Sequence, residues 1–222
     1  MGIAIGLFII SAWILHCFYI LETVICSFDS ISMWFHIYVQ TYLSVGLFIT
    51  AHDAMHGTVS LHKKANNTIG WLACFLFAGM SFKRLIKNHM NHHRFPGTEH
   101  DPDFDMSQWY IIWFFRFMIH YTTISQLVIM GALFNILQLR YSQSSLWLLW
   151  ALPSLLGALQ LFTFGTYLPH RTPHTDQMQP HNARTLTKNH VYAMLTCYFF
   201  GYHHEHHESP GTPWWKLYSL KE

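Results

Sequence analysis

The chain has 222 residues, of which 51% are hydrophobic, 17% aromatic and only 11% charged. A soluble domain carries about 25% charged residues, so this composition indicates a protein embedded in lipid. The net charge of +2 is small and no basic run interleaves with aromatic residues, which argues against a nucleic-acid partner. Four scattered cysteines without a CxxC pair argue against a disulfide framework and a thiolate metal site. The length suits one domain, residues 1–222.

Four apolar segments have a length that suits a membrane-spanning helix, for which about 20 residues are needed. They are Gly2–Cys26, Trp34–Ala51, Ile111–Leu139 and Leu146–Leu168. A fifth segment, Ile69–Phe82, is shorter, which is typical of a re-entrant or interfacial helix. We therefore predict an all-α integral membrane bundle of about four transmembrane helices.

The positions of the basic residues predict which ends of these helices face the cytoplasm, because cytoplasmic loops are enriched in Lys and Arg. With four spans and both termini inside, the outside loops are SFDSIS and RYSQSS, and together they contain one basic residue, Arg140. Arg116 lies within the third span, and the other eleven of the 13 fall on the cytoplasmic side. A multi-pass membrane protein with cytoplasmic N- and C-termini is predicted.

Histidine is unusually abundant, with 18 residues against 13 of Lys and Arg together. The four motifs HDAMH, HMNHH, YLPHR and HHEHH contain ten histidines, and the nine other than His204 are the candidate ligands: His52, His56, His89, His92, His93, His170, His203, His206 and His207. In the predicted topology all four motifs emerge on the cytoplasmic face. The other nine histidines lie singly in apolar stretches or polar loops or, for His204, off the repeated HxxHH spacing, and are interpreted as ordinary hydrogen-bonded or solvated side chains.

The spacing within these motifs favours metal binding. Residues i, i+3 and i+4 of a helix share one face, so two or three imidazoles can converge on one ion. Nine histidines exceed one zinc site and fit two ions with about four to five ligands each. Imidazole suits iron, copper, nickel and zinc, whereas haem needs only one or two histidines and calcium or magnesium prefers oxygen. The spacing predicts a histidine-rich di-metal cap but leaves the metal open.

Carboxylates inside or beside the motifs have a predicted supporting role, because metal-bound imidazoles usually donate their other N–H to an acceptor. We predict this role for Asp53, Asp101 and Glu205. For Asp103 and Glu208, a role as ordinary interfacial charges is equally consistent with the sequence.

Four blocks of the chain, AHDAMHGTV, NHHRFPGTEHDPDF, FGTYLPHR and FGYHHEHHESPGTPWW, resemble the signature blocks of the bacterial and cyanobacterial beta-carotene ketolases. These enzymes are part of the larger histidine-rich di-iron type of membrane fatty-acid hydroxylases and desaturases. The resemblance runs from about His52 to Trp215. It implies a four-helix bundle with a cytoplasmic di-iron cap, dioxygen as oxidant and an external electron donor such as ferredoxin. The nine histidines of the motifs would then bind iron, with His170 as the additional ligand. The chain departs at Phe199, where some relatives carry a histidine.

The resemblance also implies a reaction and a substrate. Position 4 of a beta-ionone ring is an allylic methylene, and two hydroxylations there followed by loss of water give a ketone, converting beta-carotene to echinenone and canthaxanthin. The carotenoid would enter from the bilayer, and Trp71, Phe82, Phe164 and Tyr167 are candidates for lining its path. Two alternatives remain on the sequence alone. One is a sibling enzyme, a carotenoid hydroxylase or acyl-lipid desaturase with the same cap. The other is a b-type haem electron carrier.

Overall fold

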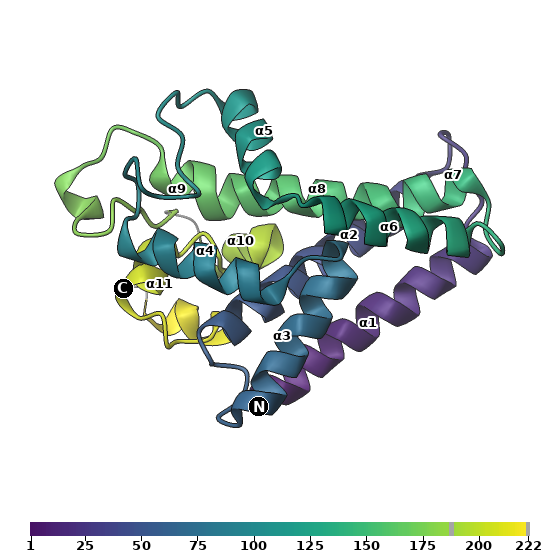
Figure 1. Ribbon diagram of the computed structural model, residues 1–222, viewed down its shortest axis with the longest axis horizontal. Helices are drawn as coiled ribbons and strands as arrows, with labels where there is room; N and C mark the ends of the chain where they lie inside the picture. The colour runs from purple at the N-terminus through teal and green to yellow at the C-terminus, as the bar shows by residue number, and fades with distance from the viewer. Residues whose placement is uncertain (187–188, 221–222) are drawn as a thin grey trace.

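The computed structural model describes residues 1–186 and 189–220, and its elements are helical (Figure 1). The α-helices are α1 (Gly2–Thr23), α2 (Ile31–Met55), α3 (Lys63–Ala78), α4 (Phe82–Arg94), α5 (Tyr110–Tyr121), α6 (Ile124–Leu137), α7 (Gln143–Ser145), α8 (Leu152–Leu161), α9 (Leu168–His170), α10 (His190–Cys197) and α11 (His203–Glu208). The π-helical segments are η1 (Leu146–Ala151) and η2 (Phe162–Tyr167), and the 3₁₀ segments are η3 (Asp176–Met178) and η4 (Trp214–Ser219). In the described ranges the β-structure is one isolated bridge, between Thr185 and Tyr202. The predicted all-α class is confirmed.

Two helices of the described chain are long and apolar enough to cross a membrane. They are α1, with 22 residues, and the composite helix Gln143–His170, with 28 residues, in which α7, η1, α8, η2 and α9 follow one another. Two bent pairs also qualify if each is counted as one span: α3 with α4, bent by 98°, and α5 with α6, bent by 86°. The described helices therefore provide between two and four candidate spans.

The bent pairs correct two predicted segments. The straight span predicted over Ile111–Leu139 is interrupted at Thr122, whose backbone is extended, and Thr123 then caps α6 by accepting a hydrogen bond from the backbone N–H of Gln126. The short helix predicted over Ile69–Phe82 instead begins at Lys63, ends at Ala78 and is followed by α4.

The central helix α2 has 25 residues, but it is not among the apolar candidates because it carries buried polar side chains. Gln40, Thr41, Ser44 and Thr50 are all buried. The three hydroxyls donate to the carbonyl four residues earlier in the same helix, and Trp13 of α1 donates its indole N–H to Ser44 over 2.9 Å. Helices α1, α3 and α8 pack around α2, so its three buried hydroxyls find partners inside the protein.

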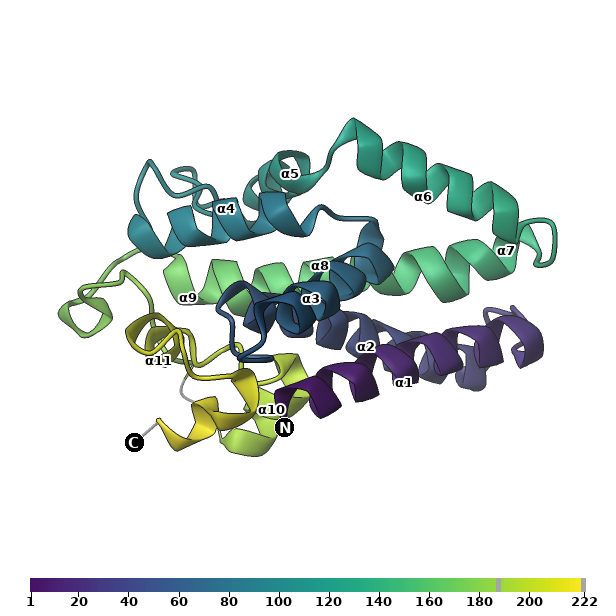
Figure 2. The ribbon, with the colours of Figure 1, turned by 60° about the horizontal axis from the view of Figure 1, so that its bottom comes forward.

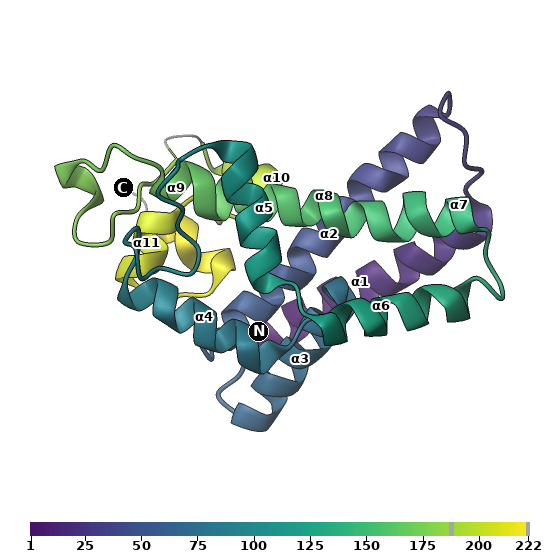
Figure 3. The same cartoon turned by 45° about the horizontal axis from the view of Figure 1, so that its top comes forward.

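The predicted outside loop RYSQSS contacts the end of α1 at one end of the molecule. Arg140 donates to the carboxylate of Glu22 over 3.1 and 3.2 Å, and the Tyr141 hydroxyl donates to Glu22 over 2.9 Å. Figures 1 and 3 show this end at the right, by α7 and the end of α6, while α4, α9 and α11 lie at the left. Figure 2 also shows α4, α9 and α11 at the left end. Met1–Ile3 and the segment around Trp215 line one hollow beside His56.

A close approach of α2 and α3 yields the first prediction. A Cβ atom on Gly70 would lie 2.5 Å from the ring of Phe82 and 2.7 Å from Cβ of Ala54. We expect Gly70→Ala to destabilise the fold by about 1–3 kcal/mol, because both neighbours are packed in the core. Gly131→Ala in α6 is the matched control, since a Cβ there meets open space. Thermal unfolding in detergent should show a lower midpoint only for Gly70→Ala. Equal midpoints would contradict the close packing at this point.

Candidate metal centre

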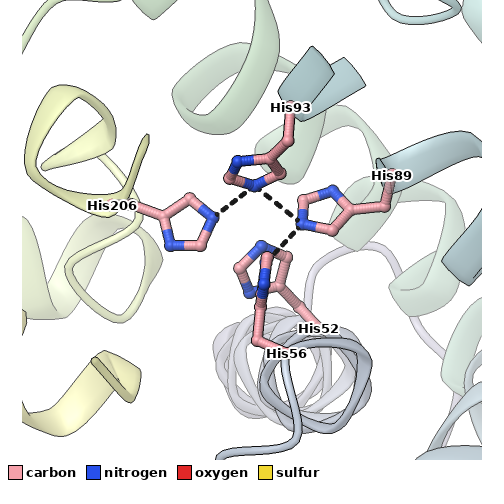
Figure 4. A group of neighbouring side chains, drawn as sticks. All are labelled: His52, His56, His89, His93 and His206. Atoms are coloured by element: carbon pink, nitrogen blue, oxygen red, sulfur yellow. Dashed lines mark hydrogen bonds between the residues drawn. The ribbon is translucent and has the colours of Figure 1, made fainter. Parts of the chain in front are cut away.

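The first histidine group joins the end of α2 to α4 and α11 (Figure 4). Its members, each with one ring nitrogen within 4.8 Å of one from every other member, are His52, His56, His89, His93 and His206. The Nε2 atoms of His56 and His89 are 2.6 Å apart, those of His89 and His93 are 3.1 Å apart, and those of His93 and His206 are 3.0 Å apart. Five imidazoles from three helices therefore converge on one point.

The second group joins α4 and α11 to α9. It consists of His92, His170, His203 and His207, again with one nitrogen each within 4.8 Å of one another. Nε2 of His207 lies 3.1 Å from Nε2 of His92 and 3.2 Å from Nε2 of His203. The ring of His170 stands edge-on to His92 and to His203, with both centroid distances 4.8 Å. The structure thus brings the nine predicted histidines into groups of five and four.

The two HxxHH motifs are divided between the groups in a crossed pattern. In α4 the i and i+4 residues, His89 and His93, belong to the first group, and the i+3 residue His92 belongs to the second. In α11 the assignment is reversed, with His206 in the first group. Residues i+3 and i+4 point about 100° apart around a helix. One motif therefore reaches two points: of the two or three imidazoles expected to converge, two share a group and the third belongs to the other group.

Local sequence determines how these helices present their histidines. Ser81 caps the start of α4, where its hydroxyl accepts the N–H of Arg84, and the helix buries one face that carries Phe82, Leu85, His89 and His92. Its apolar start packs against the bundle core, and its histidine-rich end extends beyond that core. Helix α11 has only six residues, and the N–H of His206 bonds to the carbonyl of Tyr202 over 3.1 Å.

The three imidazoles that α11 contributes to the groups are held neutral. Burial, followed by the proximity of other imidazoles, lowers the pKa of His203, His206 and His207 well below the usual value. A neutral imidazole has one N–H and one lone pair, and lone pairs that face each other repel unless a proton or cation lies between them.

The donor set fits metal ions. Nε2 of His52 in the first group and Nε2 of His170 in the second are buried without a hydrogen-bond partner in the described chain. Two imidazole nitrogens that bind one ion at about 2.0–2.1 Å lie on the order of 3 Å apart, which matches the observed separations. A metal ion in each group would satisfy these nitrogens.

Asp101 is the carboxylate in closest contact with a group histidine. Nδ1 of His92 lies 2.9 and 3.0 Å from its two oxygens, and the backbone N–H groups of Gly97 and Asp103 donate to it, each over 2.8 Å. Burial raises the pKa of Asp101, but the charge and hydrogen bond of His92 outweigh it and the net shift is downward. Such an acceptor fixes the ring so that its Nε2 faces the metal position. The backbone carbonyl of Asn182 does the same for His170, 3.0 Å from its Nδ1.

The other predicted carboxylates differ in their contacts. Asp53 is buried, lies 3.9 Å from Nδ1 of His52 and accepts the backbone N–H of Trp214 over 3.2 Å. Glu205 instead accepts a hydrogen bond from the hydroxyl of Thr185. The role of Asn182 was not predicted, because a backbone carbonyl leaves no residue-type signal in the sequence.

Asp103 and Glu208, which the sequence left undecided, lie in different surroundings. Asp103 is 3.8 Å from Nδ1 of His92 and accepts a hydrogen bond from the Tyr121 hydroxyl. Glu208 is exposed and lies 3.4 Å from Nε2 of His204.

An elongated apolar cavity of about 340 Å³ ends at the histidines. His52, His89, His92 and His203 line it together with residues of α3, α5, α6 and the composite helix. Along that helix the lining extends from Trp147 to Thr166, about 28 Å at a rise of 1.5 Å per residue. None of the four predicted path residues Trp71, Phe82, Phe164 and Tyr167 is among its lining residues. Phe82, for example, is buried against α3. Phe199 also lies elsewhere, packed near Trp214 and Tyr218.

Comparisons with known proteins agree with this geometry. The family model for fatty acid desaturases matches residues 30–145 and 127–222. Beta-carotene ketolases from two Paracoccus sp. strains are each 43% identical to the chain, over 82% of it and 76% of the relative in one case and over 80% and 74% in the other. A zeaxanthin 4-ketolase from Chlamydomonas reinhardtii is 38% identical over 79% of this chain and 41% of its own length. No solved structure matches the chain. The chain therefore belongs to the fatty acid desaturase family, in its group of carotenoid ketolases.

Proposed function

We propose that the chain is a beta-carotene 4-ketolase, which oxidises the methylene at position 4 of a beta-ionone ring to a ketone. The observation that carries this proposal is an elongated apolar cavity that ends at two converging histidine groups. A long apolar polyene with a reactive ring at its end fits a site of that shape. The identity to beta-carotene ketolases over most of the chain supports the same substrate class.

The nine histidines would hold two iron ions, five imidazoles at one and four at the other. The assignment of iron rests on the resemblance to the family, since imidazole alone also suits copper, nickel and zinc. Bound iron would supply the activation of dioxygen and the acceptance of electrons from an external protein such as ferredoxin. Asp101 holds His92 in position, and Asp53 lies beside His52. The contact of Glu205 with Thr185 gives it no comparable position.

The protein's contribution to the reaction is to place one ring carbon at the end of the cavity and to exclude water from it. Each hydroxylation puts one oxygen atom of dioxygen into a C–H bond and reduces the other to water with two electrons and two protons. A second hydroxylation at the same carbon gives a geminal diol, which loses water to form the ketone. Because the cavity wall is apolar apart from a few groups such as Tyr121 and Asp103, the ring is bound mainly by shape.

The chain is proposed to be a single membrane-embedded domain over residues 1–222, with both termini and the metal cap on the cytoplasmic side. Two observations support this orientation. The two loops at the end far from the histidines, SFDSIS and RYSQSS, contain a single basic residue, Arg140. Helix α4, next to the groups, carries exposed Lys83, Lys87 and Arg94. Cytoplasmic segments of membrane proteins are enriched in such residues.

Product analysis in a host that makes beta-carotene tests the activity. We expect echinenone and canthaxanthin, identified by their red-shifted absorption and by mass. Yellow hydroxylated carotenoids would instead support a carotenoid hydroxylase, and altered lipid acyl chains a desaturase. A haem Soret band from the purified protein without oxygen consumption would support the electron-carrier alternative.

The ligand assignment is tested by His206→Ala. We expect ketone formation to fall below detection and bound iron to fall from about two toward one per chain, because the first group loses a ligand. His204→Ala is the matched control, since His204 is in the same helix but contacts Glu208 and the carbonyl of Ala183. Membrane insertion of both variants is checked by fractionation. Normal turnover by His206→Ala would remove His206 from the ligand set.

The role of Asp101 is tested by Asp101→Asn, which keeps the shape but removes the charge beside His92. We expect iron affinity at the second group to fall about 10–100-fold, as measured by chelator competition, because His92 would lose its charged acceptor. Glu208→Gln is the same chemical change at an exposed carboxylate and should leave iron affinity unchanged. Equal affinity in the two variants would show that Asp101 does not support a ligand.

A further inference from the structure

We propose that Phe200 is a positioning residue that determines which carbon of the substrate ring is oxidised and how completely. This inference rests on the proposed ketolase activity. Phe200 is 8% exposed and lines the cavity at its histidine end. Its ring stands edge-on to His52 at a centroid distance of 4.9 Å and to His203 at 5.3 Å, and it lies 6.4 Å from His206. It therefore contacts both histidine groups and forms part of the wall that a bound ring would touch.

The backbone before Phe200 adopts an energetically unfavourable conformation that sets the direction of the Phe200 ring. Tyr198 and Phe199 have φ values of 49° and 61°, so two consecutive non-glycine residues lie in the left-handed region. Hydrogen bonds from Phe199 to the carbonyl of Ala193 and from Phe200 to that of Cys197 hold the turn. Tyr198 is also stacked on Tyr42 of α2 at 4.4 Å. Strained backbone that is held from several sides is typical of functional positions.

Gly165 provides the space for the ring on the opposite side. It lies in the π-helical segment Phe162–Tyr167 and also lines the cavity. A Cβ atom on Gly165 would be 2.1 Å from Cε1 of Phe200 and 2.4 Å from its Cδ1. Any side chain there would displace the ring, so Phe200 and Gly165 form a matched pair.

The chemistry of the phenyl ring limits what it can do. It carries no titratable group and no hydrogen-bond donor, so its effect on a substrate comes from shape and packing. Reacting atoms must be held close to their productive positions, and a displacement of about 1 Å costs on the order of 100-fold in rate. Removing the ring would let the substrate ring shift toward α9 and α11. A neighbouring carbon would then be oxidised, or the 4-hydroxy product would leave before its second oxidation.

Phe200→Leu tests this proposal against the matched control Phe77→Leu. Phe77 also lines the cavity, but its ring contact is with Phe48. Both variants are assayed for product composition and for iron per chain. We expect Phe200→Leu to retain iron and to lower the ratio of ketone to hydroxylated product about 10-fold. Phe77→Leu should lower total turnover at an unchanged ratio. An unchanged ratio in Phe200→Leu, or loss of its iron, would overturn the proposal.

A double substitution distinguishes positioning from general damage. Gly165→Ala alone should displace the Phe200 ring and lower the product ratio. Gly165→Ala combined with Phe200→Ala should give the ratio of Phe200→Ala alone, because the collision partner is gone. Additive effects of the two substitutions would contradict a shared mechanism. If the unchanged protein forms no 4-keto product, the proposed function fails. If it forms ketone but the variants keep its ratio, only the role of Phe200 fails.

Discussion

The structure depends on the burial of imidazoles whose nitrogens face one another. Nε2 atoms of neighbouring histidines come within 2.6–3.2 Å, and two further Nε2 atoms, of His52 and His170, have no partner in the described chain. Burying a polar nitrogen without a partner destabilises the fold, and a metal ion bound to these nitrogens would remove that penalty and stabilise the folded state. Since the groups draw on α2, α4, α9 and α11, ions bound there would fasten the four segments together. Metal binding and folding of this end of the molecule would therefore be coupled.

The part of the site that follows from local helical spacing could be predicted from the sequence. His89 and His93 are one turn apart, and so are His203 and His207, so their pairing on one side of each helix required no knowledge of the fold. The assignment of His92 and His206 to the opposite groups could not be predicted. It depends on how α4 and α11 approach each other, which is a tertiary property. The contact of Glu205 with Thr185 is similar, because residues 20 apart in the chain carry no pairing signal.

The fold, like the site, could be predicted only in the parts that depend on local sequence. Apolar length identified α1 and the composite helix, but it did not reveal the bend at Thr122, although two adjacent residues with good capping chemistry were a signal for it. Helix α2 was predicted as a helix, but its place at the centre of the bundle explains why it tolerates Gln40 and Ser44. The residues expected to line the substrate path were chosen by nearness to the histidines along the chain. Those residues do not line the cavity, because it is bounded by side chains on the inward faces of α5, α6 and α8.

The composite helix connects the cavity to the metal position. From Trp147 to Thr166 it forms one side of the cavity, and four residues later it supplies His170 to the second group. Its second π-helical segment, η2, contains the last lining residues, Gly165 and Thr166, and ends shortly before His170. A π turn contains an extra residue compared with an α turn, so it rotates everything that follows around the helix axis. Gly165 can then face the cavity and Phe200 while His170 faces α4 and α11. One element thus bounds the cavity and supplies one histidine of the second group, so the distance between the cavity and that histidine is set within a single helix.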